Sequence, residues 1–114
     1  ARYQPLARPG HRAPMWRDAA GRPLYDRFGP EYTLLDMHDD ARPGAAFAEA
    51  LSAAGLPVTH VHLPEPALRQ LYGSHLALIR PDQHVAWRGE HGVQDVAALL
   101  ASMGYARHQS TALR

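Results

Sequence analysis

The link Pro81-Asp82-Gln83 joins two short apolar runs, and it constrains the fold of this chain more than any other feature. The first run is "LALIR" at 76–80, and the second is "HVAWR" at 84–88. Proline suits the second position of a type I turn, and three-residue links usually close with a residue in the left-handed conformation, here Gln83. The link therefore predicts a hairpin whose two strands are antiparallel.

Alternating strand and helix patterns precede the hairpin, and one helical pattern follows it. In the first helix, Asp39 or Asp40 is expected to cap the start, Pro43 suits the first turn and Gly55 ends the helix. In the second helix, Gly73 provides the stop. The predicted elements are a strand at 32–37, a helix at 41–55, a strand at 58–63, a short helix at 65–73, strands at 76–80 and 84–88, and a helix within 92–105.

This order of elements predicts the fold class. A strand, helix and strand with short connections form a right-handed parallel crossover, whereas the last two strands are antiparallel. The combination predicts an α/β, thioredoxin-like fold with a four-stranded mixed sheet. The first and third strands should be central, and the first and last helices should cover the faces of the sheet. A ferredoxin-like plait would need two matched strand-helix-strand units, and the second half of this chain does not provide one.

Residues 1–30 are rich in proline, glycine and arginine and predict an extended arm or strap with one short helical turn near 24–28. The arm carries many aromatic residues, among them Trp16 and Phe28, so it should lie against a surface. In an isolated fragment it is expected to expose apolar area. The predicted division is an arm at 1–30, a thioredoxin-like domain at 31–105 and a polar tail at 106–114.

Composition excludes several classes of function. With 114 residues the chain fits one domain, and the absence of cysteine excludes disulfides, thiolate metal sites and a cysteine nucleophile. The 12 arginines and 11 carboxylates are scattered along the sequence, so nucleic acid is not expected as a partner. No apolar run is long enough to cross a membrane, and the start lacks the apolar segment of a signal peptide. A cytoplasmic location is expected.

The places where a thioredoxin fold carries its chemistry lack the required residues. The start of the first helix reads "DMHDDARPG" and the segment before the third strand reads "YGSHLAL", without the reactive cysteine and the proline. Disulfide exchange is therefore excluded. The sequence also contains none of the motifs GxSxG, GxGxxG and GxxxxGK[ST], which would indicate a serine nucleophile or a phosphate-binding loop.

The pair His60 and His62 is the strongest candidate for a metal site. Residues two apart on a strand point to the same face, so both imidazoles can bind one divalent cation. Glu65, His75, His84 and the carboxylates of "DMHDD" are candidates to complete the site. The alternative is a strand whose histidines face solvent or an interface.

Aromatic residues are expected to serve packing or an interface instead of catalysis. Tryptophan on a strand is most often part of a core, and this applies to Trp87. Arg80 and Arg88 flank the hairpin and are expected to pair with carboxylates. No catalytic or cofactor-binding residue is predicted, and the packing or interface residues are Trp16, Phe28, Tyr72 and Trp87.

Three segments resemble the C-terminal domain of FAD-dependent aromatic hydroxylases. They are "RPGHRAP" at 8–14, "GRPLYDRFGPEYTLL" at 21–35 and "LYGSHLALIRPDQHVAWRG" at 71–89. The family in question is the class A flavoprotein monooxygenases that act on polyketides, phenylpropionates and phenols. The resemblance covers nearly the whole chain.

The resemblance implies a thioredoxin-like domain without redox cysteines, which follows the flavin-binding and substrate domains of a larger enzyme. The parent would be an oxidoreductase that uses FAD, NAD(P)H and O2, whereas this chain alone would hold no cofactor and catalyse nothing. Its role would be packing, stability and possible homodimer formation. The alternative function is a self-standing small metal-binding domain that uses His60 and His62.

Overall fold

A computed structural model gives the structure of the protein and describes residues 7–105. The predicted polar tail at 106–114 lies outside the described residues. The elements agree in type and order with the sequence prediction. In chain order they are the 3₁₀ helix η1 (Leu24–Arg27), β1 (Tyr32–Asp36), α1 (Arg42–Ala53), β2 (Val58–His62), α2 (Pro66–Tyr72), β3 (Leu76–Ile79), β4 (Val85–Gly89) and α3 (Val96–Ser102).

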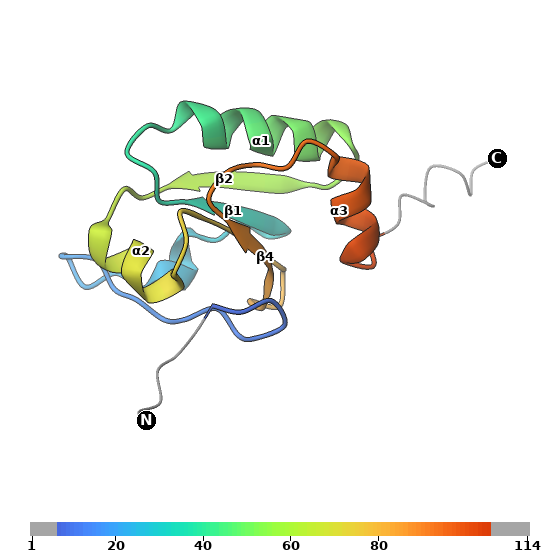
Figure 1. The fold of residues 1–114 in the computed structure, drawn as a ribbon. Coiled ribbons are helices and arrows are strands. Elements are labelled where there is room, and N and C mark those ends of the chain that lie inside the picture. Colours follow the sequence, from blue (N-terminus) through green and yellow to red (C-terminus); the bar gives the residue numbers. More distant parts are fainter. Residues whose placement is uncertain (1–6, 106–114) are drawn as a thin grey trace, which may run out of the picture.

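The four strands form one mixed sheet in the order β2-β1-β3-β4 (Figure 1). Strand β1 pairs in parallel with β2 and antiparallel with β3, and β3 pairs antiparallel with β4. The first and third strands are therefore central, which confirms the predicted α/β fold with a mixed four-stranded sheet. The connection from β1 to the parallel strand β2 runs through α1.

The hairpin has the predicted turn. Gln83 has a φ of 67° and is the one described residue other than glycine with a positive φ. The backbone N–H of Gln83 donates to the carbonyl of Arg80 (2.8 Å), and the N–H of Arg80 donates to the carbonyl of His84 (2.8 Å). Between Leu78 and Ile79 the pairing of β3 with β4 shifts by a bulge. The Pro-Asp-Gln link thus closes the hairpin as the sequence indicates.

Both α1 and α3 lie on the same face of the sheet, which differs from the prediction that they cover its two faces. Side chains of Phe47 and Leu51 from α1 and Leu99 from α3 pack with alternate residues of the central strands, such as Leu34 and Leu78. The other face is closed by different segments, so α3 is not needed there.

The arm and α2 cover the opposite face. The sheet contributes Leu35 and Ile79, and α2 contributes Leu68 and Tyr72. The arm contributes three fully or nearly fully buried side chains to this half of the core, namely Ala7, Ala13 and Leu24. The arm therefore lies against a surface of this same chain. The predicted boundary at residue 30 stays a prediction.

The arm also pairs with the start of β4 at the outer edge of the sheet. The N–H of Gly10 donates to the carbonyl of Val85 (2.7 Å), and the N–H of Val85 donates to the carbonyl of His11 (2.8 Å). The hydroxyl of Tyr72 donates to the carbonyl of Pro14 (2.8 Å) from inside the core. Among the described residues of the arm, Met15 is the large hydrophobic side chain that is exposed, at 53%, as expected of an isolated arm.

Helix α1 starts without the predicted side-chain cap. Its N-cap residue is Ala41, and no side chain of that residue accepts a hydrogen bond from the first turn. Asp40 accepts a hydrogen bond from the backbone N–H of Arg42 (3.0 Å), and its carboxylate also accepts from the Arg42 guanidinium (2.8 Å). Asp40 therefore accepts the first helical N–H from one position before the N-cap, so the prediction that Asp39 or Asp40 is the N-cap residue is wrong.

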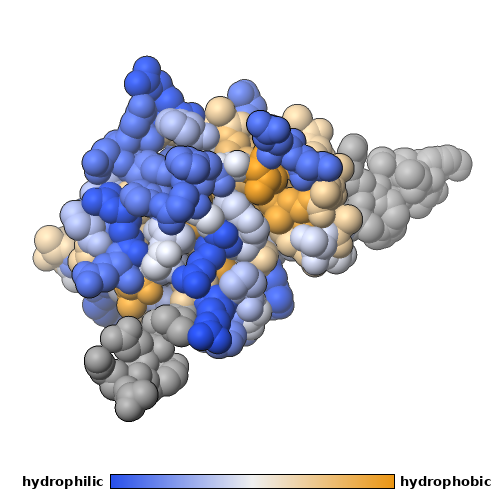
Figure 2. All heavy atoms as spheres, in the orientation of Figure 1, coloured by the Kyte–Doolittle hydropathy of each residue, from blue (hydrophilic) through white to orange (hydrophobic). Residues whose placement is uncertain are grey.

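On the face drawn in Figure 2, the hydrophobic area of the surface gathers mainly at one end. Figure 2 shows this area near α3, whereas the side of the molecule near α2 is largely hydrophilic in the same view. A shallow apolar cavity of about 240 Å³ lies between the end of α1 and α3; its lining residues are Ala54, Ala97, Leu100, Ala101 and Tyr105. Within residues 7–105, no helix is long and apolar enough to span a membrane.

Candidate functional site

A group of polar side chains gathers where β1 and β2 end. In open α/β sheets, ligands usually bind outside the carboxyl ends of the strands, at the point where successive connections leave in opposite directions. Here the chain goes from β1 to β2 on one side, and then to β3 on the other side of β1. We call this group the histidine cluster, and its members are Asp36, His38, His60, His62, His75, Glu90 and His91.

Asp36 is the buried centre of the histidine cluster. Its side chain has 0% exposure, and a buried carboxylate is costly unless hydrogen bonds compensate it. His38 donates to one oxygen from its backbone N–H and from Nδ1, both at 3.1 Å. The Nε2 atom of His60 donates to the other oxygen at 2.7 Å. Asp36 thus orients two imidazoles that come from different segments.

The first turn of α1 lies directly over this carboxylate. A Cβ atom added at Gly44 would lie 2.1 Å from Oδ2 of Asp36 and 3.0 Å from Nε2 of His60. Real Cβ atoms are not found that close to other atoms, so only glycine fits without a shift of its neighbours. The absence of a side chain at Gly44 is therefore what lets the helix cover the buried carboxylate.

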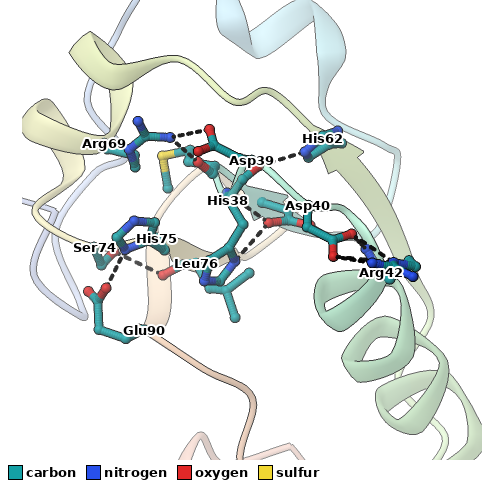
Figure 3. A network of polar contacts seen from close by, with 12 residues as sticks. His38, Asp39, Asp40, Arg42, His62, Arg69, Ser74, His75, Leu76 and Glu90 are labelled. Atoms are coloured by element: carbon teal, nitrogen blue, oxygen red, sulfur yellow. Dashed lines mark hydrogen bonds and ion pairs between the residues drawn. The ribbon is translucent and has the colours of Figure 1, made fainter.

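The loop between β1 and α1 is held from two sides (Figure 3). From β2, Nε2 of His62 donates to the carbonyl of His38 (2.6 Å). From α2, Nη1 of Arg69 donates to the carbonyl of Met37 (2.6 Å), with Asp39 at 3.4 Å. The loop conformation is therefore fixed by backbone carbonyls that accept from neighbouring elements.

Three imidazoles stack toward the surface. The ring of His38 is nearly parallel to that of His75, with centroids 4.7 Å apart, and to that of His91 at 6.2 Å. Nδ1 of His75 pairs with the carboxylate of Glu90. Beside this stack lies an open depression of about 370 Å³, lined by Pro66, Arg69, Gln70, Gly73, Ser74, His75 and Glu90.

The geometry gives no support to the predicted metal site. The ring centroids of His60 and His62 are 6.4 Å apart, and their Nε2 atoms donate to different acceptors, Asp36 and the carbonyl of His38. Glu65 is the N-cap residue of α2, and His84 pairs with Asp82 beside the hairpin turn, away from the pair. Within residues 7–105, no three His, Cys, Asp or Glu side chains are placed to hold a metal ion.

Sequence reasoning proposed Asp36 only as one of the "DMHDD" carboxylates that could complete a metal site, and it missed His38, Glu90 and His91 as members of the cluster. A signal for Asp36 was present, because the carboxylate occupies an otherwise apolar strand, "YTLLD", at a position two residues from the buried Leu34. His91 and Glu90 carry no such signal, since only the fold brings the end of β4 next to the end of β1.

The four residues predicted for packing or an interface lie on both halves of the core. Trp16 and Phe28 are partly buried on the face of the arm, where Tyr72 is fully buried. Burial raises the pKa of the Tyr72 hydroxyl far above its ordinary value, so this group stays a hydrogen-bond donor. Trp87 is partly buried on the other face, with its ring 5.4 Å from that of Phe47 in an edge-to-face arrangement.

The two arginines beside the hairpin have different partners. Arg80 pairs with Asp82 as expected, and this contact is the main cause that lowers the pKa of the Asp82 carboxyl. Arg88 was expected to pair with a carboxylate too, but its Nη1 atom donates to the carbonyl of Tyr72 (2.7 Å). That carbonyl lies at the end of α2, where backbone acceptors lack helical partners, so Arg88 closes the helix end instead.

The chemistry of the cluster is that of oriented imidazoles. A carboxylate that orients a histidine ring is a common arrangement in sites of proton transfer. Catalysis also needs a nucleophile or a place for the substrate beside that histidine. The nearest hydroxyl in the depression, that of Ser74, is buried and donates to the carbonyl of Leu76 (2.9 Å). The described residues thus assemble a network whose polar atoms are largely satisfied by one another.

The start of α1 does not fit the diphosphate of a dinucleotide cofactor. Such groups bind where backbone N–H groups of a helix start are open and acidic side chains are absent. Here Asp36 lies under the first turn, and Asp40 accepts the N–H of Arg42. The Arg42 side chain lowers the pKa of Asp40 to about 2, so this carboxyl is charged at neutral pH. Two negative charges therefore occupy the place of an anionic ligand.

Comparison with known proteins gives a consistent result. The model of the family "Aromatic-ring hydroxylase, C-terminal" matches residues 7–105. The FAD-dependent monooxygenase apdD of Emericella nidulans is 33% identical over 93 residues, which cover 78% of this chain and 15% of that protein. Aklavinone 12-hydroxylase RdmE of Streptomyces purpurascens is 37% identical over 109 residues, or 84% of this chain and 20% of that protein.

Solved structures agree with these sequence matches. The rebeccamycin biosynthetic enzyme RebC, in a structure with reduced flavin, superimposes with a TM-score of 0.78 at 31% identity. The match covers 91% of this chain and 20% of the RebC chain. The chain thus spans 15% to 20% of the length of these proteins.

Proposed function

Because this chain belongs to the family of C-terminal domains of aromatic-ring hydroxylases, we propose that it is a non-catalytic accessory domain of an FAD-dependent hydroxylase that uses NAD(P)H and O2. Its work is to pack against the flavin-binding and substrate domains of the parent enzyme and to stabilise them. The parent acts on an aromatic compound and is cytoplasmic in this proposal.

One observation carries the proposal. The family match extends over all described residues, while the matching segment makes up 15% to 20% of each compared protein. Most of the chain of each relative therefore lies outside the part that corresponds to this domain. That remainder is where the proposal places the flavin and substrate chemistry. The geometry here is consistent with that division. The polar atoms of the histidine cluster largely form hydrogen bonds with one another, and the start of α1 is unsuited to a diphosphate.

Flavin retention is the most direct test. The 114-residue chain is purified, mixed with an excess of FAD and passed through a desalting column, after which bound flavin is measured by absorbance and fluorescence. We expect no retained flavin. Stoichiometric FAD on the isolated chain would overturn the proposal, because the domain would then take part in cofactor binding.

The accessory role needs a second experiment on a full-length relative of the family. Deleting the segment that corresponds to residues 7–105 should leave the flavin absorption spectrum in place and lower the temperature of thermal inactivation. A deletion variant that is as stable as the intact enzyme would refute the packing role. Loss of the flavin spectrum in a folded variant would place cofactor contacts in this domain.

Self-association is the second role that we propose for the domain. It is supported by the β2 edge of the sheet, where β2 pairs with β1 alone among the described strands.

A further inference from the structure

The histidine cluster contains more imidazoles than carboxylates. Its five imidazoles accompany two carboxylates, those of Asp36 and Glu90. With every imidazole neutral the cluster carries two negative charges. With every imidazole protonated it carries three positive charges, because five positive charges then meet two negative ones. Histidine usually changes its charge between about pH 5 and pH 8, so acid reverses the sign of the cluster.

The charged groups around the cluster do not offset this change. Arg69 pairs with Asp39 and Arg42 pairs with Asp40, so these charges cancel in pairs. Element by element, the titratable groups in and around the cluster are Asp36 of β1, His38, Asp39 and Asp40 of the loop after β1, Arg42 of α1, His60 and His62 of β2, Arg69 of α2, His75 before β3, and Glu90 and His91 after β4. Each further proton on an imidazole therefore adds net positive charge.

The three stacked rings differ in how their charge is compensated. Nδ1 of His38 lies 3.1 Å from the carboxylate of Asp36, and Nδ1 of His75 pairs with the carboxylate of Glu90 (Figure 3). The ring of His91 is 6.2 Å from that of His38, and within residues 7–105 it pairs with no carboxylate. Protonated rings at such distances repel one another. His91 is the member of the stack whose charge no carboxylate offsets.

The other two rings are attached to segments with a fixed backbone. The carbonyl of His38 accepts from Nε2 of His62 (2.6 Å), and the carbonyl of His75 accepts from the N–H of Met37 (2.8 Å). Neither segment can move away without breaking such a hydrogen bond.

His91 lies in the link between β4 and α3, residues 90–95 (Figure 1). In the described part of the chain, the backbone of residues 90–94 forms no hydrogen bond with another residue. The link is held by its side chains and by the close approach of Gly92 to Phe47, where an added Cβ atom would lie 2.7 Å from the ring. Repulsion within the stack is therefore relieved most easily when His91 leaves.

We propose that His91 is an acid-released latch. Near neutral pH its ring stacks on His38 and holds the link between β4 and α3, whereas below about pH 6 it leaves the stack and the link becomes mobile. Acid favours the released state because that state separates the positive charges. The link leads directly into α3, so the start of this helix becomes sensitive to pH. This inference concerns the chain itself and does not rest on the accessory role.

The test is NMR relaxation of the backbone amides of the 114-residue chain at about pH 7.5 and about pH 5.5. For residues 91–94 we expect order parameters of about 0.85 at the higher pH, as in a rigid backbone, and below about 0.6 at the lower pH. The order parameters of β1 and α1 should stay the same at both values.

Two substitutions of the same kind identify the group responsible. His91→Phe keeps an aromatic ring that can stack but carries no charge, so its link should stay ordered at both pH values. His84→Phe is the matched control, because His84 lies beside the hairpin turn and pairs with Asp82 outside the cluster. The link of this control should loosen in acid as in the wild type.

A wild-type link with the same order parameters at both pH values would overturn the proposal. A link that still loosens in His91→Phe would do the same, since another group would then cause the release. Loss of order in β1 together with the link would indicate general acid unfolding and would also refute the latch. If His91→Phe fails to fold, nuclear Overhauser contacts between the ring protons of His38 and His91 in the wild type decide. They should be present at the higher pH and absent at the lower, and contacts that persist in acid contradict the release.

Discussion

Gly44→Ala is the substitution that most directly tests the account of the histidine cluster. In an ordinary exposed helix position, alanine in place of glycine stabilises the helix by about 1 kcal/mol. Gly44 lies in the first turn of α1 and has no positive φ, so its backbone accepts alanine without strain. Any loss of stability must therefore come from what the new methyl group meets.

The methyl group would lie 2.1 Å from Oδ2 of Asp36. Overpacking in a closed core costs about 1–3 kcal/mol, and moving a buried carboxylate away from its donors costs about 1.5–3 kcal/mol for each charged hydrogen bond that is weakened. With the gain of about 1 kcal/mol from helix propensity, we expect a net loss of about 2–4 kcal/mol in the free energy of unfolding. For a domain of this size each kcal/mol lowers the melting temperature by about 4–8 °C.

Urea unfolding followed by circular dichroism measures this free energy. Ala45→Gly is the matched control on the neighbouring exposed position, and it should cost about 1 kcal/mol through propensity alone. Asp36→Ala removes the carboxylate, and Gly44→Ala introduced into that variant should become neutral or stabilising. The difference between the two backgrounds isolates the contact. A Gly44→Ala protein as stable as the wild type would refute the close packing of α1 over Asp36.

Three further changes test other parts of the structure. Trp87→Ala should cost about 2–3 kcal/mol, because the partly buried ring packs against Phe47, and an unchanged unfolding curve would show that the ring serves only an interface. Tyr72→Phe should cost about 1 kcal/mol by removing the hydrogen bond to the arm, and it should raise proteolysis of the arm; identical digestion rates would contradict this. Arg42→Ala should raise the pKa of Asp40 from about 2 toward its ordinary 3.8, as measured by NMR titration. Since the folded-state pKa is lowered, the stability from this pair is present above pH 3.8 and is lost as the pH falls toward about 2, and no change of the pKa would contradict the pairing.

The local sequence determined the elements and the turn. Glycine and proline mark the helix ends, as at Gly73, whose φ of 69° closes α2. Gln83 was expected in the left-handed conformation because the length of the link requires it, and it adopts a φ of 67°. These features depend on neighbours within a few residues, so they can be predicted before the fold is known. The strand order was expected because a parallel crossover followed by a hairpin is the pattern of the thioredoxin-like fold.

Only the tertiary structure decided which segments meet. The arm and α2 cover one sheet face, so α3 joins α1 on the other face, and nothing in the periodicity of either helix indicates this. The predicted pair of His60 and His62 is divided between two acceptors because Asp36 and the carbonyl of His38 lie at the end of the neighbouring strand. A side chain chooses its partner by distance in space, and residues 24 positions apart become neighbours only when the parallel strands pair.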